Sequence, residues 1–118
     1  MLIEIVPYKP HWPEEFQQIG CRLRAVLGDA ALRIDHIGST SVPALAAKDI
    51  IDVQITVAKL DPLIAARMVE NGYRHIAHII GDHRPPTDTN PEEQWSKWIF
   101  NAAADQRPAN LHMRIDGY

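Results

Sequence analysis

Disulfides, membrane spans and an excess of basic charge are all missing from this sequence. It has one cysteine, Cys21, which cannot form a disulfide within the chain. No apolar run approaches the roughly 20 residues that a membrane-spanning helix needs, and the first residues lack the basic start and long apolar stretch of a secretory signal. These absences favour a cytoplasmic protein with no membrane association. Fifteen acidic residues against 12 basic ones give a formal net charge of −3, which disfavours nucleic acid as a partner.

A single folded domain fits what the chain does contain. Its 118 residues are 46% hydrophobic and 23% charged, an ordinary globular balance. Two independent cores in a chain of this length would each be too small to be stable. We therefore expect residues 1–118 to form one domain.

Helices and strands are both predicted. Pro13 and the two glutamates after it suit the start of a helix, and apolar residues then recur at helical spacing to residue 27. Asp61 and Pro62 begin a second helix that ends near residue 71. Residues 38–48 form a loop of small residues that could hold one helical turn, and strands are predicted at residues 2–6, 31–37, 49–58, 73–80, 95–102 and 110–115. Residues 95–102 also fit one face of a helix. The mixture predicts an α+β fold.

The end of the chain carries a turn signal without a return strand. Asp116-Gly117 is a strong hairpin-turn dipeptide, and only Tyr118 follows it. This predicts either that the natural domain continues past this point or that another chain completes it. A frayed tail is the alternative, with about equal weight.

The most informative stretch joins a small-residue turn to an acidic strand. Gly38 allows the backbone to approach an anion closely; Ser39 and Thr40 add hydroxyls, and successive amides at such a turn can hold phosphate oxygens. Asp52, on the next strand, would hold a hard cation that bridges those phosphates. The alternative is a structural turn with Asp52 in an ion pair. Spacing alone favours that alternative, because small Gly-Ser loops are common.

A longer pattern changes this weighting. The run His-Ile-Gly-Ser-Thr-Ser-Val-Pro at residues 36–43, followed by Ala-Ala-Lys at 46–48 and Ile-Ile-Asp at 50–52, resembles the GrpB family. The domain of that family also occurs fused behind some dephospho-CoA kinases. Weaker matching pieces lie in the right order: Pro7-Tyr8, Trp12-Pro13, Asn71-Gly72-Tyr73 and Asn110-Leu111-His112. The resemblance implies a nucleotidyltransferase-like α+β fold, a mixed sheet flanked by helices, with its C-terminal part missing here.

The resemblance also implies a site. Gly38, Ser39, Thr40 and Lys48 would bind the phosphates of a nucleotide, and Asp52 would be the catalytic carboxylate that holds Mg²⁺. In that fold two carboxylates stand two residues apart on a strand, because such residues share one face. Here the second position is Gln54, whose amide oxygen can ligate a metal but brings no negative charge.

Three further positions bear on this site. His112, on the last strand, is a candidate third metal or proton-transfer group facing Asp52. Asp49 stands where the family usually has proline, and Ala44 where it usually has glycine. Asp49 cannot replace the missing acid, since three residues along a strand point to the opposite face.

Two functions follow from this resemblance. The first is a GrpB-like protein that binds a nucleotide or another phosphorylated ligand with a divalent cation, and that could retain nucleotidyl transfer. The second is a non-catalytic folding-accessory or interaction module acting with a kinase partner, which Gln54 favours. A homodimer that replaces the missing C-terminal layer is a third expectation.

Other candidates carry less weight. His75, His78 and His83 match no compact zinc-ligand spacing, because the first two would face opposite sides of a strand. Residues 82–84 favour a solvated loop over a phosphate site, and a structural hydrogen bond is the favoured role of His36. The three tryptophans are expected to pack, and Cys21 to be a small buried side chain.

Overall fold

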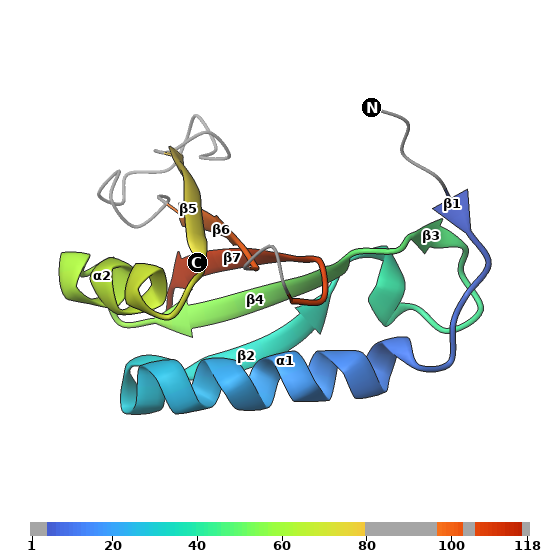
Figure 1. Cartoon of the computed structure of the whole chain (residues 1–118), viewed down its shortest axis with the longest axis horizontal. Coiled ribbons are helices and arrows are strands. Elements are labelled where there is room, and N and C mark those ends of the chain that lie inside the picture. Colours follow the sequence, from blue (N-terminus) through green and yellow to red (C-terminus); the bar gives the residue numbers. More distant parts are fainter. Residues whose placement is uncertain (1–4, 80–96, 103–105, 117–118) are drawn as a thin grey trace, which may run out of the picture.

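A mixed five-stranded sheet forms the centre of the molecule in the computed structural model, which describes residues 5–79, 97–102 and 106–116 (Figure 1). The strand order is β2-β4-β7-β6-β5. The strands are β2 (Arg33–Ile37), β4 (Ile51–Val57), β7 (Ala109–Ile115), β6 (Lys97–Asn101) and β5 (Arg74–Ile79). Only β4 and β7 run parallel; the other neighbours are antiparallel. Two short strands, β1 (Ile5–Val6) and β3 (Ala47–Lys48), pair separately beyond one end of this sheet.

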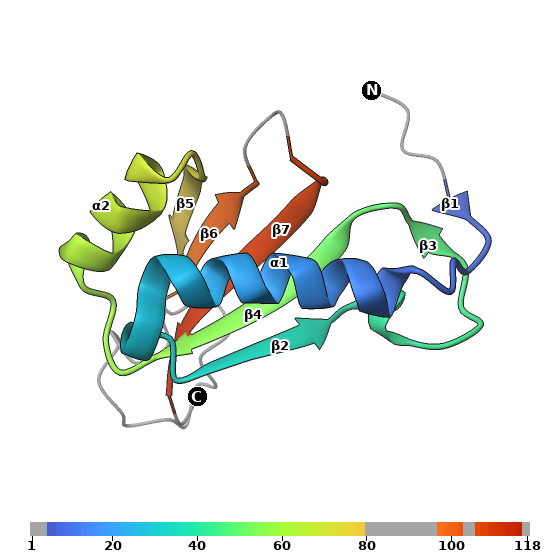
Figure 2. The same cartoon turned by 60° about the horizontal axis from the view of Figure 1, so that its bottom comes forward.

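Both described helices cover the same face of the sheet (Figure 2). Helix α1 (Trp12–Leu27) has proline and two acids in its first turn and ends at Gly28, as the sequence predicts. Helix α2 (Pro62–Glu70) is capped by the Asp61 side chain, which accepts from the Leu63 amide at 2.9 Å. No helix in the described part of the chain is long and apolar enough to cross a bilayer.

The core lies between the helices and this sheet face. Alternate residues of β4 (Ile51, Val53, Ile55 and Val57) are completely buried, because successive side chains of a strand point to opposite faces. Leu23 and Leu27 of α1 and Met68 of α2 are buried in the same core. The remaining β4 residues and their neighbours on β7 are mostly polar and half-buried. One face of the sheet therefore packs on helices and the other is polar.

Most predicted elements are confirmed, with differences in detail. Residues 97–101 form a strand, so the helical alternative for this segment is wrong; Trp98 faces the core, as does Trp12. The 38–48 loop contains one 3-10 turn, η2 (Ser39–Ser41). Strand β4 begins at Ile51, so Asp49 lies before it in the link from β3. Residues 1–4 and 117–118, Trp95 and the predicted loop at 82–84, including His83, lie outside the described residues.

The exposure of Cys21 and the register of β5 differ from the simple expectation. Cys21 is exposed. It stands two residues before the buried Leu23, and two residues of an α-helix correspond to a rotation of about 200°, so Cys21 points away from the core. A β-bulge between His75 and Ala77 shifts the register of β5. His75 pairs with Phe100 on one side of this bulge, and Ala77 pairs with Ile99 on the other.

Candidate functional site

A cavity of about 640 Å³ lies at one end of the polar sheet face, where β2 runs into the η2 turn. Its lining includes six of the seven site residues that the sequence predicts: Gly38, Ser39, Thr40, Lys48, Asp52 and His112. Gln54, the seventh, is not part of this lining, although its pairing with His112 puts it on the same face. The turn and the acid of the next strand thus share one cavity.

Gly38 packs directly against the carboxylate of Asp52. Its backbone has φ 74° and ψ −171°, a region that only glycine adopts without strain. A Cβ on Gly38 would lie 2.6 Å from Oδ2 of Asp52, far inside van der Waals contact. The absence of a side chain therefore lets the carboxylate sit against the turn.

The contacts of Thr40 and His36 connect the η2 turn to helix α1. Thr40 is buried, and its hydroxyl lies 2.9 Å from Nε2 of His36. The His36 ring stacks on Phe16 of α1, with 4.9 Å between ring centroids. Burial lowers the pKa of His36, and the charge of Asp52 acts in the opposite direction. The predicted structural role of His36 fits these contacts. The Thr40 hydroxyl faces His36. The Ser41 hydroxyl donates to the Gly38 carbonyl, and Ser41 does not line the cavity, so Ser39 is the exposed serine of the turn in the cavity lining.

His112 lies close to Asp52 across the sheet. Its Nε2 lies 3.8 Å from Oδ1 of Asp52, and the two side chains are 27% and 30% exposed. Among the described residues, no group of three histidine, cysteine, aspartate or glutamate side chains could hold a metal ion together. A cation at Asp52 would therefore need ligand oxygens from a bound molecule or from water.

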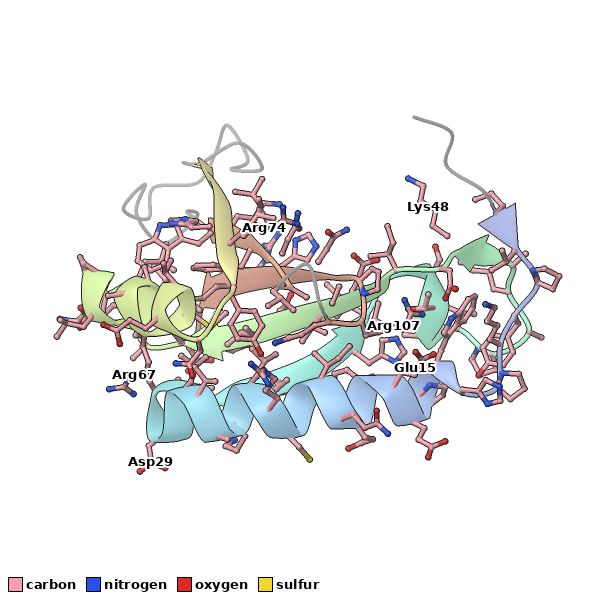
Figure 3. All side chains as sticks on the ribbon, viewed as in Figure 1. Glu15, Asp29, Lys48, Arg67, Arg74 and Arg107 are labelled. Atoms are coloured by element: carbon pink, nitrogen blue, oxygen red, sulfur yellow. The ribbon has the colours of Figure 1, made fainter. Side chains whose placement is uncertain are left out.

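Asp49 does not line the cavity, but its hydrogen bonds fix the segment beside it. Its carboxylate accepts hydrogen bonds from Nζ of Lys9 and Nε1 of Trp12, both at 2.9 Å, and from Arg107, which also pairs with Glu15 (Figure 3). The hydrogen bond from Lys9 is the main cause that holds the pKa of Asp49 down at about 2. This cluster ties the start of α1 and the approach to β7 to the segment between Lys48 and Ile50, which both line the cavity.

Asn110 and Ile50 also line the cavity, and sequence reasoning missed both as site residues. Asn110 pairs with Asp52 across the parallel β4–β7 ladder. A run of asparagine, leucine and histidine marks a strand in the sequence, but only the strand order shows which earlier residue it faces.

Comparison with known proteins identifies the family to which this chain belongs. The family model described as GrpB protein matches residues 2–118. The chain belongs to the GrpB family. The resemblance carried by residues 36–52 is thereby confirmed.

The GrpB relatives include longer proteins. The dephospho-CoA kinase of Mycolicibacterium paratuberculosis is 38% identical over 98% of this chain and 32% of its own length. That of Mycobacterium tuberculosis is 38% identical over 97% of this chain and 31% of its own. The chain thus spans about a third of the length of these curated relatives.

A solved GrpB structure confirms the α+β prediction. The crystal structure of the conserved protein GrpB from Enterococcus faecalis superposes with a TM-score of 0.70 at 26% identity. The match covers 97% of this chain and 63% of that one.

Two departures from the expected GrpB pattern have a visible structural setting. Ala44 has φ +68° and is the only non-glycine residue with positive φ in the described part of the chain, so a glycine is the unstrained residue there. Asp49, in the usual place of proline, is the centre of the cluster with Lys9, Trp12 and Arg107. Neither change removes a group from the cavity.

Proposed function

We propose that this GrpB domain binds a nucleotide or another phosphorylated ligand together with Mg²⁺ in the cavity beside η2. The observation that carries the proposal is the packing of Asp52 against Gly38 in a cavity that Lys48 also lines. A carboxylate, a small-residue turn and an exposed ammonium together match a metal-bound phosphate. We expect this binding in the cytoplasm.

Each group has a distinct part in this proposal. Gly38 and Ser39 seat the phosphates through the turn, and Lys48 offsets their charge. Asp52 holds Mg²⁺, with His112 close enough to join the ligand set or accept a proton. In nucleotidyl transfer, an acceptor hydroxyl oxygen would bond to the α-phosphorus in line as pyrophosphate leaves. Because Gln54 adds no negative charge, Mg²⁺ is held weakly. We therefore expect measurable nucleotide binding but slow nucleotidyl transfer.

The test is a thermal-shift titration with ATP or GTP, with and without Mg²⁺. Ligand at about 100 times its dissociation constant adds about 2.7 kcal/mol of stability, which is a rise of several degrees in melting temperature. The Asp52→Asn substitution should change nucleotide affinity in opposite directions with and without Mg²⁺. Binding with Mg²⁺ weakens because the cation loses its ligand, whereas binding without Mg²⁺ tightens because a repulsive carboxylate is gone.

Asp35→Asn is the matched control. Asp35 lies on the same face of the sheet as Asp52 and pairs with Gln54, two residues along the β2–β4 ladder. Its carboxylate pairs with Arg33 at 3.0 Å, and it does not line the cavity. It should change binding slightly and in the same direction with or without Mg²⁺. Absence of any shift with millimolar nucleotide, or identical behaviour of the two variants, contradicts the proposal.

The kinase relatives support a second candidate, a non-catalytic accessory module. A segment similar to this whole chain makes up about a third of each dephospho-CoA kinase named above. In this function the domain assists the folding of a kinase partner, and the cavity is incidental. The test measures recovery of active dephospho-CoA kinase on refolding, with and without the domain. Equal assistance by wild type and Asp52→Asn supports it; no assistance by either excludes it.

A further inference from the structure

A single row of paired residues crosses the whole sheet on its polar face. The ladder pairs Ile37 with Asp52, Asp52 with Asn110, Asn110 with Asn101, and Asn101 with Arg74. Residues directly opposite in neighbouring strands point to the same face. An acid, two amides and a guanidinium-bearing residue therefore follow one another from β4 to the edge strand β5.

A second cavity continues the first along this row. It has a volume of about 240 Å³, and its lining includes Arg74, Asn101 and Gln106. Ile50 and Asn110 line both cavities. The two cavities are therefore adjacent, and together they form a trough that follows the row of paired residues from η2 to β5.

Positive charge stands at both ends of this trough. Lys48 lies at the η2 end and Arg74 at the β5 end, and both point to the side of the sheet away from α1 (Figure 3). The side chain of Arg74 is exposed, and it forms no hydrogen bond or ion pair with any residue that the structure describes. Three strand spacings of about 4.8 Å separate Asp52 from Arg74, which is about 14 Å. The lining between them includes the neutral amides of Asn110 and Asn101 beside apolar residues such as Ile50 and Ala109.

We propose that Arg74 forms a second anion-binding subsite of the same ligand site. The ligand is then an elongated small molecule with an anionic group at each end and hydrogen-bonding groups between them. One anion binds at Gly38 and Lys48, and the other pairs with the guanidinium of Arg74, whose planar fork matches a phosphate or carboxylate. Asn110 and Asn101 both donate and accept, so they suit the polar middle of such a molecule. This inference rests on the proposed phosphate binding at the η2 turn.

A series of molecular rulers tests the inference. The probes are oligo(ethylene glycol) chains of increasing length that carry a phosphate at both ends, with the monophosphates of the same chains as references. Isothermal titration calorimetry with Mg²⁺ measures their affinity for the intact chain. We expect the second phosphate to tighten binding roughly tenfold when the linker spans about 10–15 Å, and to have little effect in shorter probes.

Two variants separate a specific subsite from general attraction. Arg74→Gln should remove the gain from the second phosphate and leave monophosphate affinity unchanged. Arg114→Gln is the control: Arg114 lies on the same face of β7 and loses the same charge, but it lines neither cavity. It should preserve the gain.

Each result decides between the two proposals. If bisphosphates bind no tighter than monophosphates at any length, or if both variants weaken them equally, the Arg74 subsite is wrong and the η2 phosphate site stands. If neither the monophosphates nor ATP bind, the proposed function fails and the subsite fails with it.

Discussion

Replacing Gly38 with alanine tests the contact on which the candidate site depends. Two costs add. The backbone at φ 74° and ψ −171° is a glycine-only region that costs another residue about 1–3 kcal/mol. The new Cβ would also lie 2.6 Å from Oδ2, 3.1 Å from Cβ and 3.2 Å from Cγ of Asp52, so that side chain must leave its rotamer at about 0.5–1.5 kcal/mol.

We therefore expect Gly38→Ala to lower the free energy of unfolding by about 2–4 kcal/mol. Urea denaturation at neutral pH measures it, with a lower midpoint at an unchanged slope. Gly28→Ala is the matched control, because Gly28 also has positive φ, at 55°, but an added Cβ would meet no atom within 4 Å. It should show the backbone cost without the crowding.

A double-mutant cycle isolates the contact itself. Asp52→Ala removes the 2.6 and 3.2 Å contacts and keeps the one at 3.1 Å. In that background Gly38→Ala should cost about 1 kcal/mol less than in wild type. Gly38→Ala should also reduce the Mg²⁺-dependent nucleotide shift, because the carboxylate is displaced. A coupling energy of zero, with equal losses in Gly28→Ala and Gly38→Ala, would refute the placement of Asp52 against the turn.

Three other predictions concern pH and backbone strain. Because the pKa of Asp49 is lowered from 3.8 to about 2, foremost by the hydrogen bond from Lys9, its contribution to stability is complete above pH 5 and is lost as the pH falls toward 2. Asp49→Asn should flatten that part of a stability-against-pH curve measured by chemical denaturation; an unchanged curve contradicts the assignment. Burial lowers the pKa of His36 below 6.5, so the unfolded chain takes up a proton first and stability falls as the pH drops through 6.5. His36→Gln should reduce this slope between pH 7.5 and 5.5. Ala44→Gly, which relieves the positive φ of 68°, should raise the free energy of unfolding by about 0.5–1 kcal/mol in urea titrations; a loss of stability would contradict net strain at this position.

Local patterns predict the elements of this fold better than their arrangement. Helical spacing of apolar residues and proline-acid starts predict both helices, and the β-branched run predicts β4. Segment 95–102 is ambiguous in the sequence because Trp95, Trp98 and Ile99 also fit one face of a helix. Only the pairing of residues 97–101 between β5 and β7 decides for a strand. The insertion of β7 beside β4, and the bulge in β5, arise from long-range hydrogen bonding that no local pattern records.

Some residues of the candidate site can be predicted from local sequence patterns, and others cannot. Gly38 and Asp52 are predictable as a pair because a turn that needs glycine leads to a strand with one acid. Asn110, Asn101 and Arg74 are not, because each joins the site only through its strand partner. The prediction for Cys21 is wrong because a position near an apolar stripe is not a position on it.

The parallel pair at the centre of the sheet has a consequence for how the chain folds as it is made. Ile51 pairs with Ala109, so β4 keeps an open edge until the residues of β7, more than 50 positions later, have been synthesised. Strand β5 likewise pairs only with β6, which comes after it. A nascent chain of the first 80 residues therefore exposes unpaired backbone groups along two strands, which favours association with other chains. Production of this domain should depend on temperature and on holdase chaperones more than its small size suggests.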